Sequence, residues 1–195
     1  MPPLLAFGGL HGAPTWGSAA LRHKDQMQDF LDEVERAVPA LRRYARALTR
    51  DADRADDLVQ DCLERAIRKH RLWRPTGPLQ AWLFRILVNL HRNQARHIRR
   101  QGETVPIDGL PAEPSSPAAQ PGRLALAEMA RAIDRLPDEQ RQALLLVGLE
   151  GFDYSEAASI LGIPAGTLMS RLSRARAALR IATGTGDEPR LRTIK

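Results

Sequence analysis

The residues of this sequence whose types and spacing suggest chemistry are mainly arginines. Between Glu64 and Glu103 there is no acidic residue, but there are ten lysines or arginines and three histidines. An exposed helix surface usually mixes both signs of charge, because like charges four residues apart repel. Guanidinium groups bind phosphates and base edges through paired hydrogen bonds. An ordinary basic helix pair remains an alternative, but the one-sided charge favours a surface that binds a polyanion.

A second stretch, "GIPAGTLMSRLSRARAALR" at 162–180, also lacks acidic residues. It follows "DYSEAASIL", which we expect to be a short helix that starts at Asp153 or Ser155 and ends at Gly162. A short helix, a turn with glycine and a longer helix form the helix-turn-helix pattern. Leucines of the longer helix share its inner face, whereas serines and arginines point outward, where they suit the major groove. A basic helical hairpin without a DNA role is the alternative.

A third stretch, "DADRADDLVQDCLERA" at 51–66, is acidic. Asp51 or Asp53 is a suitable N-cap. The predicted helix has an apolar face, and its opposite face carries Asp57, Gln60 and Asp61. Carboxylates and an amide on an exposed face can pair with arginines of a partner helix. A merely solvated acidic face is the alternative.

Composition argues against several function classes. The single cysteine, Cys62, excludes an internal disulfide and a cysteine-rich zinc site, and the five histidines show no metal-ligand spacing. We find no paired carboxylates, nucleophile–base set or phosphate loop, so we predict no enzyme activity, no cofactor and no metal. The apolar stretches at 82–90 and 144–149 are far shorter than the roughly 20 residues of a membrane span. We expect a cytoplasmic protein without membrane insertion.

The periodicity predicts an all-α protein with two small helical domains, here called the first module and the second module. Five prolines between them, at 102–122, predict a flexible linker. The segment before Met27 is rich in glycine and proline, and either it is a disordered extension or translation starts at Met27. The predicted parts are a disordered extension (1–25), the first module (26–101), the linker (102–122), the second module (123–182) and a tail (183–195). The inward face of the first helix is predicted to carry Leu31, Val34, Val38, Leu41, Tyr44, Ala45 and Leu48.

Both modules resemble one family, the sigma-70 initiation factors of bacterial RNA polymerase, in its extracytoplasmic-function (ECF) group. "DADRADDLVQDCLERA" resembles the region that docks on the clamp helices of the polymerase largest subunit. "LWRPTGPLQAWLFRILVNLHRNQARHIRR" is similar to the melting and −10 recognition regions, and "LPDEQRQALLLVGLEGFDYSEAASILGIPAGTLMSRLSRARAALR" to the region that reads the −35 element. The resemblance covers about residues 28–101 and 123–181.

The resemblance implies a role for particular residues. It assigns core polymerase binding to Asp57, Leu58, Val59, Gln60 and Asp61. It assigns −10 recognition and melting to Arg74, Asn89, Arg92, Asn93, Arg96, Arg99 and Arg100. It assigns −35 recognition to Thr167, Ser170, Arg171, Ser173, Arg174 and Arg176. Asn93 departs from the family, where an aspartate is frequent, and Met169 stands where many members carry lysine.

The loop "HRLWRPTGPLQ" stands where these factors hold a base flipped out of the −10 strand. A loop restricted by proline and glycine, beside basic helices, can hold one unstacked base. Trp73 either stacks on DNA or packs inside the protein, whereas Trp82 is expected in the core.

The resemblance also implies partners: core RNA polymerase, including the flap of its second-largest subunit, promoter DNA and an anti-sigma factor. The expected function is promoter-specific initiation of transcription. One rival is a sigma-like mimic that titrates an anti-sigma factor without binding DNA, which would lose the basic groove-facing residues. Another is a simple helix-turn-helix repressor, which would not explain the acidic Asp57–Asp61 surface.

Overall fold

The computed structural model describes residues 16–73, 77–101 and 121–184. In these ranges every regular element is a helix, as predicted, and no strand occurs. The first module consists of α1 (Trp16–Thr49), α2 (Ala52–Arg68), the 3₁₀ helix η1 (His70–Leu72) and α3 (Leu79–Gln101). The second module consists of α4 (Pro121–Asp134), α5 (Asp138–Gly148), α6 (Tyr154–Leu161) and α7 (Ala165–Ala182). The segment 102–120, where most of the predicted linker falls, lies outside the described residues.

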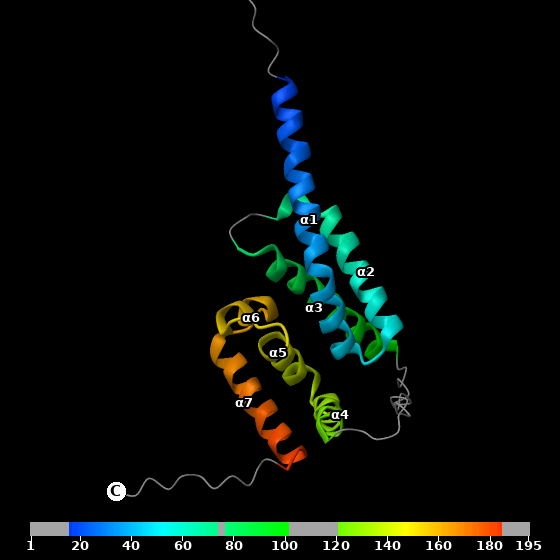
Figure 1. Cartoon of the computed structure of the whole chain (residues 1–195), viewed down its shortest axis with the longest axis vertical. Helices are drawn as coiled ribbons and strands as arrows, with labels where there is room; N and C mark the ends of the chain where they lie inside the picture. Colours follow the sequence, from blue (N-terminus) through cyan, green and yellow to red (C-terminus); the bar gives the residue numbers. More distant parts are fainter. Residues whose placement is uncertain (1–15, 74–76, 102–120, 185–195) are drawn as a thin grey trace, which may run out of the picture.

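Helix α1 begins earlier than the sequence pattern indicated. The predicted disorder of residues 1–25 is wrong for 16–25, because α1 already begins at Trp16, while 1–15 lie outside the described residues. No proline interrupts the chain between Trp16 and Pro39, and alanine, leucine, lysine and glutamine are good helix formers. The helix extends well beyond the ends of its neighbours (Figure 1). The first predicted helical segment is therefore one continuous helix, which contains Pro39.

Local signals in the sequence set most of the other helix ends. The side chain of Asp51 accepts a hydrogen bond from the backbone N–H of Arg54 and is the N-cap of α2. Asp153 caps α6 and forms a capping box with Glu156, in which each side chain accepts from the other residue's backbone N–H. Gly162 ends α6 in the left-handed region at φ 65°, a conformation that glycine adopts at little cost. Helix α5 ends at Gly148, and its first turn carries Asp138 and Glu139.

The two modules pack against each other and share one hydrophobic core. Helix α1 contacts α5, and α3 contacts α6, so the second module lies along the lower half of the first (Figure 1). At the junction the Phe84 ring packs edge-on against Tyr44 and Phe152, with centroids 5.2 and 5.0 Å apart. Buried residues of both modules belong to the same cluster. The sequence pattern predicts two modules on a tether but does not indicate this contact.

The predicted inner face of α1 is confirmed for most residues but not for Leu31. Leu31 is exposed, whereas its neighbour Phe30 is buried. The rings of His70, Trp73 and Trp82 pack against Phe30, so the side of α1 that they cover is that of Phe30. Among the described residues, no helix is both long and apolar enough to cross a membrane.

Candidate functional site

Helix α2 presents an acidic surface on the outside of the first module. Asp57, Gln60 and Asp61 are exposed, and the Gln60 amide donates a hydrogen bond to the Glu64 carboxylate at 3.4 Å. Leu58 and Val59 are only 0% and 3% exposed. Their side chains are thus not accessible to a partner in this structure, and their predicted role in polymerase binding stays a prediction. They belong to the core against which the acidic face is held.

Helix α3 carries the basic residues predicted to read and melt DNA. Asn89, Asn93, Arg96 and Arg100 are exposed, and Arg96 donates to the Asn93 side-chain oxygen at 3.0 Å. Arg74 lies outside the described residues. Arg99 lies on α3, between Ile98 and Arg100.

Arg92 differs from the other predicted DNA-binding residues of α3, because the second module holds it. Its guanidinium donates to Gln142 Oε1 at 3.0 Å and to the Leu161 carbonyl oxygen at 2.8 Å. Burial, and the nearby positive charge of Arg171, lower the pKa of Arg92 from its ordinary value. Arg92 is thus a half-buried contact between the modules, and the prediction that it faces DNA does not hold for this arrangement.

Asp138, at the start of α5, is the centre of a polar network beside Arg92. His91 lies 3.3 Å from its Oδ1, Arg141 donates to the same oxygen at 3.0 Å, and Gln142 donates to Oδ2 at 2.6 Å. Burial alone would raise the pKa of Asp138, but hydrogen bonds and charge from His91 and Arg141 outweigh it and lower the pKa to about 2. The carboxylate therefore stays charged and ties α3 to the second module.

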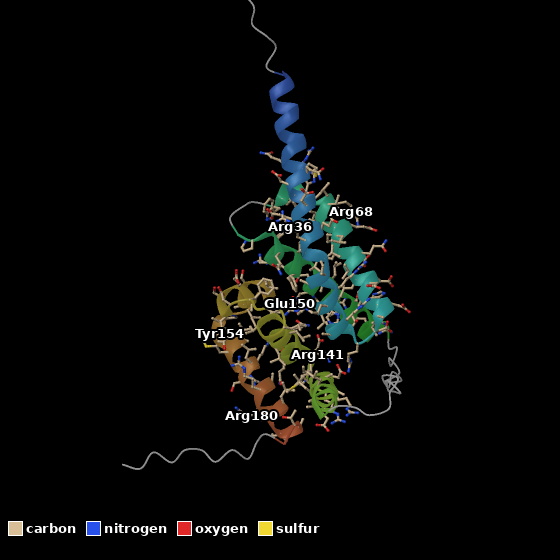
Figure 2. The ribbon with its side chains drawn as sticks, in the orientation of Figure 1. Arg36, Arg68, Arg141, Glu150, Tyr154 and Arg180 are labelled. Atoms are coloured by element: carbon tan, nitrogen blue, oxygen red, sulfur yellow. The ribbon has the colours of Figure 1, made fainter. Side chains whose placement is uncertain are left out.

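A further ion pair joins the modules at Glu150, which Figure 2 marks near their junction. Arg43 of α1 donates to both carboxylate oxygens of Glu150, one of them at 3.1 Å from Nε. The Glu150 side chain is 0% exposed, whereas that of Arg43 is 52% exposed. The hydrogen bonds and negative charge of Glu150 raise the pKa of Arg43. This junction therefore contains a buried carboxylate that is paired with an arginine of the other module.

The residues of α7 that are predicted to read the −35 element differ in their exposure to solvent. Ser173, Arg174 and Arg176 are exposed, as a groove-reading helix requires, while Thr167 and Ser170 are partly buried. The Arg171 side chain is only 15% exposed and forms an ion pair with Glu139 of α5. Arg171 therefore has a structural partner within the second module.

Tyr154 of α6 lies beside the exposed face of α7, and the sequence did not predict it there. Arg176 donates to the Tyr154 hydroxyl at 3.2 Å. Figure 2 marks Tyr154 on the side of the second module away from the first. Tyr154 also lines a groove of about 360 Å³ together with Met169, Ser173 and Arg180. Nothing in the local sequence distinguishes this tyrosine, because its link to α7 is tertiary.

A second, larger groove lies between the loop before α3 and helix α6. It measures about 580 Å³, and its walls include Trp73, Pro78 and Trp82 of the first module and Ser155 and Ser159 of the second. Arg85, also on its wall, donates to the Ser159 hydroxyl at 2.6 Å. Trp73 is half-buried, so it both packs inside the protein and borders this groove.

Comparison with known proteins identifies the family. Residues 34–88 match the family model described as the Sigma2 domain of PhyR, and residues 126–179 match Sigma-70, region 4. The chain is 46% identical over 149 residues to the ECF RNA polymerase sigma factor EcfG of Rhodopseudomonas palustris, a match that covers 76% of this chain and 81% of EcfG. The chain belongs to the ECF sigma factors. These are non-enzymatic transcription initiation factors, as the sequence predicted.

Two further relatives support this membership over nearly the whole chain. The sigma factor is 33% identical over 181 residues to SigM of Mycobacterium tuberculosis, which covers 91% of this chain and 88% of SigM. It is also similar to the sigma factor RpoE of Bartonella quintana, solved in complex with the anti-sigma factor NepR. That likeness has a TM-score of 0.67 at 37% identity and covers 83% of this chain and 99% of RpoE.

The described residues also include potential metal ligands and the cysteine Cys62. Among them, no group of three or more histidines, cysteines, aspartates or glutamates is arranged to hold a metal ion. Cys62 is buried, and burial raises the pKa of its thiol to about 12.

Proposed function

We propose that this sigma factor binds core RNA polymerase through Asp57, Gln60 and Asp61 and directs initiation at promoters with its two basic helices. Helix α3 would read and help to melt the −10 element, and α7 would read the −35 element. The observation that carries the proposal is the separation of charge: carboxylates cluster on the outer face of α2, whereas Arg174 and Arg176 are exposed on α7. Carboxylates on α2 suit arginines of a protein partner, and the arginines of α7 suit DNA.

The packing of the modules implies that DNA binding requires them to separate. Arg92 donates both of its hydrogen bonds between modules to Gln142 and Leu161, so it can reach DNA only after these bonds break. The −10 and −35 elements are separate parts of a promoter, and the two modules would have to move apart to reach both. The arrangement described above is thus a closed form that would precede the polymerase-bound form.

An anti-sigma factor is the regulator that we propose for the closed form. The sigma factor RpoE was solved with the anti-sigma factor NepR, and CnrH, which is 28% identical with a TM-score of 0.60, was solved with the cytosolic domain of CnrY. A partner that binds only the closed form would stabilise it by mass action. In that form Arg92 stays bound to the second module.

The regulatory mimic is the second candidate, because the first module matches a model named after PhyR. A solved PhyR is described as an anti-anti-sigma factor in complex with NepR; its likeness to this chain, at 18% identity, concerns the fold alone. A mimic would bind an anti-sigma factor but would not start transcription. The identity with EcfG extends over both modules and favours the initiation factor.

The test is transcription in vitro with purified core polymerase, this sigma factor and a library of genomic promoters, followed by sequencing of transcript 5′ ends. We expect start sites that share upstream elements near −10 and −35 and that are absent with core polymerase alone. Binding to the polymerase without any specific start site would contradict the proposed function. Binding to an anti-sigma factor alone would favour the mimic.

A further inference from the structure

The groove of about 360 Å³ on the second module, here called the α6–α7 groove, lies between the first residue of α6 and one side of α7. Tyr154 forms the α6 wall. The α7 wall is one stripe of residues that follow each other three or four positions apart: Met169, Leu172, Ser173, Arg176 and Arg180. Every residue of the wall belongs to the second module, so separation of the two modules leaves this groove intact.

The α6–α7 groove is basic and faces away from the first module. Figure 2 labels Tyr154 and Arg180 on the outer side of the second module. Arg176 is exposed, and its hydrogen bond of 3.2 Å to the Tyr154 hydroxyl holds the guanidinium beside the groove. Because α7 carries no acidic residue, this side of the module suits the phosphates of DNA.

Met169 is the exposed side chain at the N-terminal end of this stripe. It is 51% exposed and is the fifth residue of α7, in the part of a recognition helix that reaches base edges. Its two neighbours along the chain are bonded within the second module. The Ser170 hydroxyl donates to the Thr167 carbonyl at 2.9 Å, and Arg171 forms an ion pair with Glu139. Of these three consecutive residues, Met169 is therefore the one whose side chain is available to DNA.

The chemistry of the Met169 side chain restricts what it can recognise. A thioether is only a weak hydrogen-bond acceptor, so its main contacts are apolar. In the major groove, thymine offers an apolar group to a protein through its C5 methyl. A single exposed methionine would need no explanation, but Tyr154, which is 41% exposed, adds a second apolar side chain to the same groove. Two such side chains beside Arg176 form a surface that suits a base edge with a methyl group.

We propose that Met169 reads a thymine of the −35 element by packing its side chain against the C5 methyl group. Tyr154 and Arg176 form the wall of the α6–α7 groove beside this contact. The proposal rests on the proposed function and deepens it, because it assigns one side chain of α7 to one feature of the promoter. Burial of one methyl group should contribute about fourfold in affinity.

The test uses deoxyuridine, which differs from thymidine only in lacking this methyl group. Holoenzyme made from core polymerase and full-length sigma factor is titrated with a promoter fragment found in the transcription experiment. Each thymine of the −35 element, on either strand, is replaced by uracil in turn. We expect one position at which uracil lowers the affinity about fourfold. With Met169→Ala holoenzyme, uracil at that position should lower the affinity no further, because the protein side of the contact is already absent.

Two variants of exposed residues serve as controls. Met169→Leu keeps an apolar side chain and should keep part of the sensitivity to uracil. Ile181→Ala is the matched control, because Ile181 is 80% exposed on the same helix but is not part of the groove wall. It should show the same loss of affinity with uracil as the unchanged protein. Both Met169→Ala and Ile181→Ala shorten exposed side chains, so the melting temperature should change little.

Three results would overturn the proposal: no thymine of the −35 element at which uracil weakens binding, the same loss with uracil in Met169→Ala, or removal of the loss by Ile181→Ala. Weaker binding of Met169→Ala to core polymerase, at unchanged affinity for DNA, would also overturn it, because the groove would then bind protein. Failure of the unchanged holoenzyme to recognise any −35 element would instead refute the proposed function, on which the role of Met169 depends.

Discussion

The ion pair between Arg43 and Glu150 predicts how firmly the two modules are held together. Arg43→Met removes the only arginine bonded to a carboxylate whose side chain is fully buried in the described structure, while it keeps most of the aliphatic stem. A hydrogen bond to a charged group contributes about 1.5–3 kcal/mol. Because half of the Arg43 side chain is exposed, solvent screening reduces the expected loss to about 1–2 kcal/mol. The equilibrium should shift toward separated modules by roughly 5- to 30-fold.

Hydrogen exchange measured by mass spectrometry suits this prediction, because it detects an open form even when that form is rare. Peptides from α6 and from the C-terminal half of α3 should exchange faster in Arg43→Met, whereas peptides from α2 should not change. X-ray scattering of the same samples should show a larger radius of gyration where the open form is well populated. Arg42→Met is the matched control, because Arg42 pairs with Asp56 inside the first module, 3.8 Å away.

Glu150→Gln tests the reasoning about the buried charge. Arg43→Met combined with Glu150→Gln should open less than Arg43→Met alone, because the double variant leaves no unpaired carboxylate in the interface. Equal exchange in Arg43→Met and Arg42→Met would refute the assignment of this pair to the closed form. A double variant that opens as much as the two single effects added would show that the buried charge is not the cause.

The other predictions concern the surfaces and the pH dependence. Asp57→Arg with Gln60→Ala should abolish co-purification with core polymerase while promoter DNA binding by the second module survives, which pull-down and gel-shift assays would check. Arg174→Ala should weaken −35-dependent transcription by about 1–3 kcal/mol if the side chain contacts a base, or lower the salt slope of binding by about one if it contacts phosphate. Arg171→Ala should in addition lower the melting temperature, because Arg171 pairs with Glu139. The depressed pKa of Asp138 stabilises the folded state above about pH 4, and this contribution is lost as the pH falls toward 2, so Asp138→Asn should remove about 2 kcal/mol of that pH dependence in acid unfolding curves.

The sequence by itself determined the features that depend on neighbouring residues. The caps at Asp51 and Asp153, the turn at Gly162 and the division into two helical modules follow from short-range hydrogen bonding and from periodicity. The separation of acidic α2 from basic α3 and α7 was also readable, because charge is a property of composition along the chain. One local prediction was wrong, since disorder was expected at residues 16–25, where α1 is already helical.

Only the tertiary structure decided which of the charged and aromatic side chains are exposed and which are buried or bound by the other module. Arg92 and Arg96 lie one turn apart on the same helix, yet Arg92 is bound by the second module and Arg96 is exposed. Phe30 is buried and Leu31 exposed, although the helical pattern favoured Leu31 as the inward residue. Both outcomes depend on segments far away in the chain: Gln142 and Leu161 for Arg92, and Trp73 for Phe30. Helical periodicity states which residues share a face, but what covers that face is settled by packing between elements that the local pattern does not encode.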